Sequence, residues 1–236
     1  MKGFPNQVAE LPKIADGIKC LVDIVDAGRN GRDDGVFGEG LVRARVAGTG
    51  HKPKPIDQYL AEQRLKSASN QSFRTTARGL RELYRIMNLI DDSAGPVVVT
   101  PLGRTAASFS GKKWDEKQTD FWRGVIRDIE HSDEHGNTSH PYQVLLRLVA
   151  RKPGITRAKC ALALEARDDS AKELDRIAAL ADLSESDIID KLGVSQSNWD
   201  NAKKVLPKFA EQLDDVVRSS GGTFVLADAP GKAETT

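Results

Sequence analysis

The stretch "SNQSFRTTARGLRELYRIMNLI", residues 69–90, decides the fold class expected for this chain. At about 100° per residue its apolar side chains fall on one broad face, so the stretch predicts an amphipathic helix. Four arginines lie within about 40° of one line beside that face, at i, i+4, i+7 and i+11: Arg74, Arg78, Arg81 and Arg85. Only Glu82 is near them, and like charges at i, i+4 cost about 0.2–0.5 kcal/mol per pair. A bound polyanion would relieve that repulsion; a solvated basic face on a packed helix is the alternative interpretation.

A turn, a short β segment and another helix are expected directly after this helix. Residues 91–96, "DDSAGP", are typical of a turn, "VVVT" (97–100) of a strand, and "TPLGRTAAS" (100–108) of a turn that opens a helix. Helix, turn, β segment and helix in this order indicate a winged helix, with residues 69–90 as the recognition helix. An unrelated α/β arrangement is the alternative.

The chain before the arginine-rich helix is expected to alternate between helices and irregular segments. The expected elements are a helix over 11–27, a loop with five glycines over 28–40, a short strand over 40–48 and a helix over 56–67. Side chains alternate across a strand, so Arg43 and Arg45 would share one face.

The second half repeats this element order. The expected elements are a helix over 115–130, a loop over 131–141, helix, turn and helix over 141–166, and two helices capped by Ser184 and Ser195. "PKFAEQLDDVV" (207–217), "RSSGG" (218–222) and "TFVLA" (223–227) then predict a helix, a turn and a strand. Pro207 falls inside the second recognition helix, which should kink or restart there.

Composition favours two folded domains that are mainly α-helical with small β wings. The chain has 236 residues, 39% hydrophobic and 29% charged, which suits a folded core. We expect tandem winged-helix units over 1–132, with a basic N-terminal extension, and over 133–228, and a linker or tail over 229–236.

Charge is distributed unevenly along the chain. Residues 41–85 hold ten Lys/Arg against three Asp/Glu, a net charge of +7, whereas residues 165–236 hold nine against fifteen, or −6. The first of these regions is therefore the one expected to meet an anion. The chain has neither a run of about 18 apolar residues nor a signal-peptide pattern, so we expect a cytoplasmic protein without a membrane partner.

No catalytic or metal site is expected. His131, His135 and His140 lie in a polar segment without a nearby cysteine, and exposed loop histidines are the expectation there. "SFSGKKW" (108–114) lacks the spacing of a phosphate-binding loop, and the pattern of carboxylates and lysine needed for a metal-dependent nuclease is absent. Cys20 and Cys160 lie in apolar helical patterns and are expected to be buried, reduced thiols.

Three stretches resemble the DNA-recognition region of type IIS restriction endonucleases and the related nicking endonucleases. They are "TTARGLRELYRIMNLI" with "PVVVTPLGRTAAS", "FWRGVIRDIE" leading into "HPYQVLLRLVARKPGITRAKCALAL", and "NWDNAKKVLPKFAEQLDDVVRSSGGTFVLAD", within residues 70–228. The resemblance implies tandem winged-helix subdomains that bind a short asymmetric site on double-stranded DNA as a monomer. It also implies a separate C-terminal nuclease domain or subunit using Mg²⁺; this chain, without that motif, would be a fragment or a recognition subunit with no cofactor of its own.

We therefore expect specific contacts between the chain and double-stranded DNA. Phosphates would be bound by Arg43, Arg45, Lys52 and Lys54. Base edges would be read by Arg74 and Arg78 with Asn70 and Gln71, which stand at the start of the recognition helix. Arg81 and Arg85 would neutralise the DNA backbone, Arg104 would be a phosphate contact or a helix-start charge, and the lesser contacts would be Asn198, Asn201 and Lys204. A winged-helix transcriptional regulator, a replication-associated protein and a protein-interaction module are the alternatives.

Overall fold

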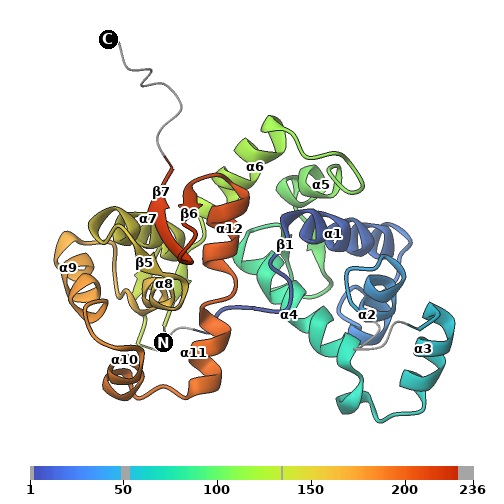
Figure 1. Ribbon diagram of the computed structural model, residues 1–236. Helices are drawn as coiled ribbons and strands as arrows, with labels where there is room; N and C mark the ends of the chain where they lie inside the picture. The colour runs from blue at the N-terminus through green and yellow to red at the C-terminus, as the bar shows by residue number, and fades with distance from the viewer. Residues whose placement is uncertain (1–2, 49–53, 134, 228–236) are drawn as a thin grey trace. The chain divides into compact units, whose positions relative to one another are not determined.

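The computed structural model describes residues 3–48, 54–133 and 135–227. Its secondary structure is mainly α-helical with small antiparallel sheets (Figure 1), as the composition and patterning predicted. The chain divides into two compact units, an N-terminal unit of residues 4–128 and a C-terminal unit of residues 129–236 with residues 1–3. The sequence predicted the boundary between the units after residue 132, whereas the structure places it after residue 128.

The N-terminal unit is a helical bundle with one short hairpin. Its elements are α1 (Leu11–Asp26), α2 (Asp34–Arg43), α3 (Ile56–Arg64), the 3-10 turn η1 (Ala68–Asn70), α4 (Ser72–Ile86), β1 (Ile90–Asp91), β2 (Val98–Val99), α5 (Pro101–Ala107) and α6 (Glu116–Arg127). α2 packs mainly on α4, and α1 on α5. β1 and β2 are antiparallel, with Ile90 opposite Val99.

The loop predicted over 28–40 holds only for residues 28–33, and the strand predicted over 40–48 is wrong, because α2 takes up residues 34–43. Asp33 caps the helix: its side chain accepts hydrogen bonds from the backbone N–H groups of Gly35 at 2.7 Å and Val36 at 3.3 Å. Burial of Phe37 offsets the low helix propensity of the glycines. Arg43 is consequently the last helical residue rather than part of a strand face.

Glycines in α1 and α2 allow these helices to pack closely against their neighbours. A Cβ atom placed on Gly38 of α2 would lie 2.8 Å from the backbone oxygen of Phe73 on α4. Gly40 similarly meets Cys20 of α1, and Gly17 of α1 meets the Tyr84 hydroxyl of α4. The three helices approach one another at positions where no side chain would fit.

α4 confirms the helix predicted from residues 69–90, although it is shorter at both ends. Its buried residues are Phe73, Ala77, Leu80, Leu83 and Tyr84, the apolar face that the spacing predicted. The helix ends in a Schellman turn, with Asn88 left-handed at φ 55° and Leu89 N–H donating to the Tyr84 carbonyl oxygen at 2.8 Å. The chain then enters the β1–β2 hairpin.

The C-terminal unit combines helices with a three-stranded sheet. Its elements are β3 (His131–Ser132), β4 (Thr138–Ser139), α7 (Pro141–Arg151), β5 (Ile155–Thr156), α8 (Arg157–Cys160), η2 (Ala161–Glu165), α9 (Ala171–Leu180), α10 (Glu185–Leu192), α11 (Gln196–Ala202), α12 (Leu206–Gln212), β6 (Val216–Arg218) and β7 (Thr223–Leu226). The sheet order is β5-β7-β6, all antiparallel. The restart predicted at Pro207 is confirmed, since α11 ends at Ala202 and Pro207 lies in the first turn of α12. The loop predicted over 131–141 contains the β3–β4 hairpin instead.

The two units bury residues at corresponding positions, 126 residues apart in the sequence; Trp199, for example, corresponds to Phe73. The buried pairs at this offset are Phe73 and Trp199, Leu80 and Leu206, Leu83 and Phe209, Met87 and Leu213, and Ile90 and Val216. Asp214, the equivalent of Asn88, is also left-handed at φ 55°, and Asp215 N–H donates to the Ala210 oxygen at 3.0 Å. α11 and α12 together therefore correspond to α4, and β6 and β7 to its hairpin.

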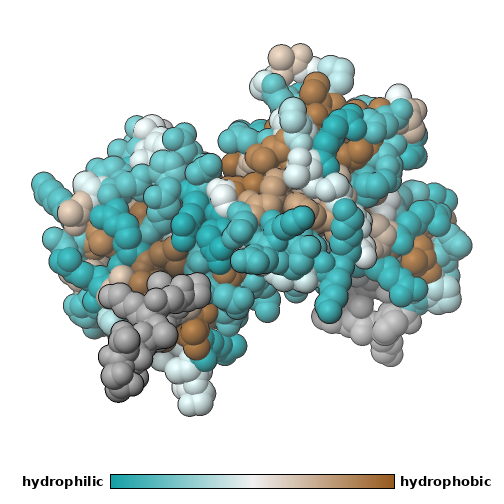
Figure 2. Space-filling view, turned by 90° about the horizontal axis from the view of Figure 1, so that it is seen from above, coloured by the Kyte–Doolittle hydropathy of each residue, from teal (hydrophilic) through white to brown (hydrophobic). Residues whose placement is uncertain are grey.

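Hydrophilic residues cover most of the face seen in Figure 2, with smaller apolar areas between them. The described large apolar side chains that stay exposed include Val98 on β2 and the cross-strand pair Val217 and Val225. Within the described residues, no helix is both long and apolar enough to cross a bilayer.

The glycine contact between α2 and α4 gives a stability test. We expect Gly38→Ala to lower the free energy of unfolding by about 1–3 kcal/mol, because its methyl group would force the two helices apart. Gly124→Ala on α6 is the matched control, because nothing lies within 4 Å of the Cβ position of Gly124. This substitution should raise the free energy of unfolding by about 0.5–1 kcal/mol through the higher helix propensity of alanine. Urea unfolding measures both. Equal effects of the two substitutions would contradict the packing role of Gly38.

Candidate nucleic-acid interface

One face of α4 points away from the core of its unit. Ser72, Thr75, Arg78, Glu82 and Arg85 are exposed along it at helical spacing. Thr75 was missed in the sequence, although the helical period places it one turn before Arg78. This face presents two arginines and two hydroxyls against one carboxylate, and the Ser72 hydroxyl is also hydrogen-bonded to Tyr59 at 2.8 Å.

Arg81 is held inside the unit. Its NH1 atom lies 2.8 Å from the Asp34 Oδ1 atom and donates to the Arg32 carbonyl oxygen at 3.0 Å, and its Nε atom lies 3.8 Å from Asp92 Oδ2. Only 17% of its side chain is exposed. Arg81 thus connects α4 to α2 and to the hairpin, and it is poorly placed for the backbone contact expected from the sequence.

Gln71 and Arg74 are bonded to each other. Arg74 Nε donates to Gln71 Oε1 at 2.7 Å, and Gln71 Nε2 donates to the Lys66 carbonyl oxygen at 3.1 Å. Arg74 also lies 3.8 Å from Asp33 Oδ1. Gln71 is buried with both ends of its amide engaged, so it is not presented at the surface as a base reader would be. Asn70, by contrast, is exposed in η1.

Arg78 and Arg85 are the exposed members of the arginine line. Arg78 Nε lies 3.2 Å from Asp34 Oδ2, with 56% of the side chain exposed. Arg85 Nε donates to Glu82 Oε2 at 3.0 Å with 50% exposed, and this hydrogen bonding raises the pKa of Arg85. The Arg85–Glu82 pair is exposed on both sides and contributes about 0–1 kcal/mol, whereas in the Arg78–Asp34 pair the arginine is exposed and Asp34 is only 21% exposed. Because both arginines are exposed, each can exchange its carboxylate for a phosphate.

The cations predicted to bind phosphate outside α4 differ in their surroundings. Arg43 NH1 lies 3.1 Å from Asp57 Oδ1, and Lys54 Nζ lies 2.5 Å from a Glu62 oxygen. Arg45 is exposed in a left-handed conformation at φ 58°, with no ion pair to any residue that the structure describes. Lys52 lies outside the described residues.

Arg104 has a structural partner. Its two terminal nitrogens donate to the two oxygens of Asp26 at 2.8 and 3.0 Å, a bidentate pair that joins α5 to the end of α1. The hydrogen bonds lower the pKa of Asp26 and raise that of Arg104. This arrangement satisfies Arg104 within the fold, where the sequence suggested a phosphate contact or a helix-start charge.

The two hairpins differ in charge. The β1–β2 hairpin carries Asp91 and Asp92 and no basic residue between 90 and 99; Asp91 accepts hydrogen bonds from Ser93, which lower its pKa. The β6–β7 hairpin carries the exposed Arg218 directly before the turn "SSGG". Arg218 was missed in the sequence, and its position at the tip of a hairpin is the signal that identifies it.

The residues predicted from the C-terminal unit lie together on and just after α11. Asn198 is exposed, and Asn201 Oδ1 accepts a hydrogen bond from the exposed Lys204 at 2.7 Å. At the offset of 126 these three residues are the equivalents of Ser72, Thr75 and Arg78 on α4.

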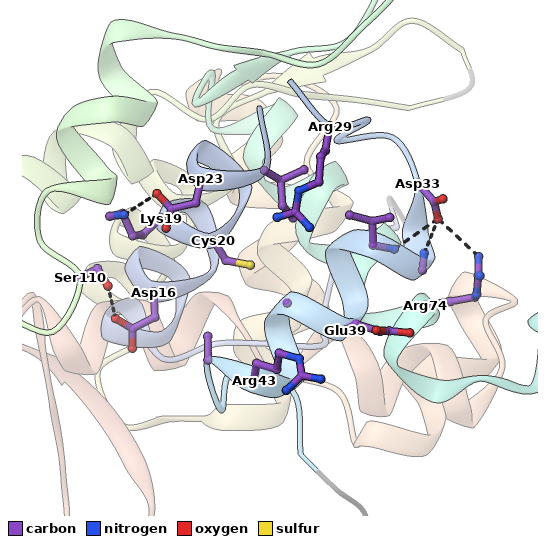
Figure 3. A pocket seen from close by; sticks show the side chains of 15 residues that line it. Asp16, Lys19, Cys20, Asp23, Arg29, Asp33, Glu39, Arg43, Arg74 and Ser110 are labelled. Atoms are coloured by element: carbon purple, nitrogen blue, oxygen red, sulfur yellow. Dashed lines mark hydrogen bonds and ion pairs between the residues drawn. The ribbon is translucent and has the colours of Figure 1, made fainter. Parts of the chain in front are cut away.

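A hollow of about 760 Å³ lies beside α1 and α2 in the N-terminal unit (Figure 3). Acidic and basic side chains line it in equal number: Asp16, Asp23, Asp33, Glu39, Lys19, Arg29, Arg43 and Arg74. Figure 3 shows the Cys20 thiol pointing into it, and the Asp16 carboxylate accepting a hydrogen bond from Ser110 at 2.7 Å. Such a balanced lining favours neither an anion nor a cation.

The three described histidines, His131, His135 and His140, do not gather into a metal site. His140 Nδ1 lies 2.6 Å from Asp169 Oδ2, and His131 contacts the Gly3 carbonyl oxygen. These two are half-buried rather than solvent-exposed, whereas His135 is exposed as predicted. In residues 3–48, 54–133 and 135–227 no three His, Cys, Asp or Glu side chains are placed to hold a metal ion.

No family model matches this chain, nor does any curated protein or solved structure. Its own residues must therefore indicate its function.

The two cysteines give a pH-dependent prediction. Cys160 is buried as predicted, whereas Cys20 is only half-buried. Burial raises the pKa of Cys20 to about 11, with Asp23 adding to the shift, and burial raises the pKa of Cys160 to about 12. In the unfolded chain a thiol loses its proton near pH 9, whereas in the folded chain these two thiols keep their protons to higher pH. The contribution of the protonated thiols to stability is therefore complete below pH 9 and is lost as pH rises through 11. We expect slow alkylation by iodoacetamide at neutral pH until urea unfolds the chain. Rapid labelling of the folded protein would contradict this.

Proposed function

We propose that this chain is a sequence-specific double-stranded DNA-binding protein whose N-terminal unit reads DNA with the outward face of α4. The observation that carries the proposal is the exposed set Ser72, Thr75, Arg78 and Arg85 on a helix anchored by its buried face. The chemistry of this set suits a DNA groove, because arginine pairs with guanine, and threonine can contact a thymine methyl group. Asn70, exposed just before the helix, adds a group suited to adenine.

The element order supports winged-helix units in both halves. α3 and α4 are joined by a short connection and followed by the β1–β2 hairpin. In the C-terminal unit α10 takes the place of α3, and α11 with α12, which together correspond to α4, leads into β6 and β7, which join β5 in a three-stranded sheet. In this proposal the acidic β1–β2 hairpin supports α4 through Arg81 and Asp92, while the β6–β7 hairpin offers Arg218 to phosphate.

The other contacts are assigned by exposure. Phosphate binding is assigned to Arg45, Arg43 and Lys54, the last two after exchange of their carboxylate partners. Asn198, Asn201 and Lys204 form the corresponding surface of the C-terminal unit. Gln71 and Arg81 are assigned to the fold because their side chains are engaged and largely buried there. Arg104 is half-exposed, and its bidentate geometry with Asp26, not burial, assigns it to the contact of α5 with α1.

The resemblance to type IIS restriction and nicking endonucleases suggests the biological role. In that role this chain supplies recognition, and a nuclease domain or subunit using Mg²⁺ supplies cleavage. The residues assigned here take part in binding and orientation alone.

Selection of bound sequences from a random duplex pool tests the proposed function. We expect one short asymmetric sequence bound by a monomer, with affinity that falls as salt rises. A palindromic sequence bound by a dimer would favour a transcriptional regulator instead. Absence of salt-dependent binding would overturn DNA binding and favour a protein-interaction module.

Two neighbouring arginines provide a matched test of the interface. Arg78→Ala should weaken binding of the selected sequence by about 1–3 kcal/mol and relax the preference at one base, with little change in stability. Arg81→Ala should instead lower the free energy of unfolding by about 1–3 kcal/mol, because Asp92 loses its arginine and the mostly buried Asp34 keeps only Arg78. Fluorescence titration with DNA and urea unfolding separate the two effects. Equal binding losses for both variants on selected and random DNA would contradict the assignment.

A further inference from the structure

Carboxylates from α2 face the arginine line of α4. Asp34 contacts two arginines at once, with Oδ2 3.2 Å from Arg78 Nε and Oδ1 2.8 Å from Arg81 NH1. Asp33 Oδ1 lies 3.8 Å from Arg74 NH1. These acids are some 40 residues from α4 in the sequence and arrive there through packing of α2 on α4.

Stability of α2 accounts for part of this arrangement. Carboxylates in the first turn of a helix interact favourably with its dipole, and Asp33 also caps the helix. Arg81, mostly buried, needs a counter-ion as well. Neither need involves Arg78, which is mostly exposed and could reach solvent without Asp34.

The Asp34–Arg78 pair places a carboxylate in competition with any phosphate that approaches α4. Non-specific DNA binding depends on the number of phosphates that cations neutralise. A carboxylate that holds Arg78 lowers this non-specific affinity. A bidentate base contact discriminates by about 1–3 kcal/mol, whereas an exposed ion pair contributes about 0–1 kcal/mol, so the correct base can displace Asp34 where a single phosphate gains little.

We propose that Asp34, assisted by Asp33, is a specificity-determining residue that withholds the α4 arginines from the phosphates of random DNA. The inference rests on the proposed function, because it concerns the same face of α4. It assigns discrimination to two acidic side chains that need not touch a base.

The test compares charge-neutral variants on a short random-sequence duplex and on the selected sequence. Asp34→Asn should bind the random duplex about two- to fivefold more tightly, with the slope of log affinity against log salt steeper by about one. The ratio of selected to random affinity should fall. Asp33→Asn should act in the same direction through Arg74, and it protects the test against misfolding because asparagine caps a helix as well as aspartate does.

Two controls separate the carboxylate contact from general charge. Asp120→Asn on α6 removes the same charge from an exposed pair, with Arg123 NH1 at 3.1 Å, and should leave the affinity ratio unchanged. In an Arg78→Ala background the gain from Asp34→Asn should vanish, because Arg81, the other partner of Asp34, is mostly buried and stays held by Asp92 and the Arg32 carbonyl oxygen. A gain that persists in that background, or that Asp120→Asn reproduces, overturns the inference.

The results also distinguish this inference from the proposed function. If the wild type binds DNA through Arg78 and Asp34→Asn changes nothing, the inference is wrong and the function stands. If only the Asp34→Asn variant binds, through Arg78, the carboxylate contact is confirmed and DNA binding by the native chain is overturned. If neither binds, both are overturned.

Discussion

The tight contact between Gly38 of α2 and the Phe73 backbone of α4 determines where the charges of the N-terminal unit meet. A Cβ atom at residue 38 would lie 2.8 Å from the Phe73 oxygen, so any larger residue would separate the helices. Because the helices come this close, the capped start of α2 lies beside the arginine line. Asp34 can then reach Arg78 and Arg81 together. Backbone packing thus decides which arginines are retained within the fold and which stay at the surface.

The electrostatics of α4 could not be read from its own neighbourhood in the sequence. Only Glu82 is close to the four arginines along the chain, whereas Asp34 reaches them through tertiary structure. That contact was hidden because residues 28–40 read as a loop. Glycine costs about 1 kcal/mol in a helix relative to alanine, so three glycines argue against α2 unless its packing is known. One wrong element therefore led to the wrong surroundings for Arg78 and Arg81.

Features set by local chemistry were predictable. The apolar face of α4 followed from its period of 3.6, and the Ser184 and Ser195 caps followed from side chains that accept hydrogen bonds from the third helical residue. Pro207 lacks a backbone N–H, and the chain accordingly restarts a helix beside it. What local chemistry leaves open is which polar groups the fold uses: Arg104 and Gln71 resemble surface groups until Asp26 and the Lys66 carbonyl are placed beside them.

The shared packing of the two units carries two different surfaces. At the offset of 126 residues the cores match, yet the equivalents of Arg74, Arg78, Arg81 and Arg85 are Asp200, Lys204, Pro207 and Glu211. One cation remains of four, so the second helix attracts a polyanion less than α4 does. Its exposed Asn198 and half-buried Asn201 favour hydrogen bonding over charge. If the proposed function holds, the two unlike units of a single chain offer no pair of identical surfaces, whereas a palindrome would need the same unit from two chains. If both units meet one duplex, the sequence they read must therefore be asymmetric.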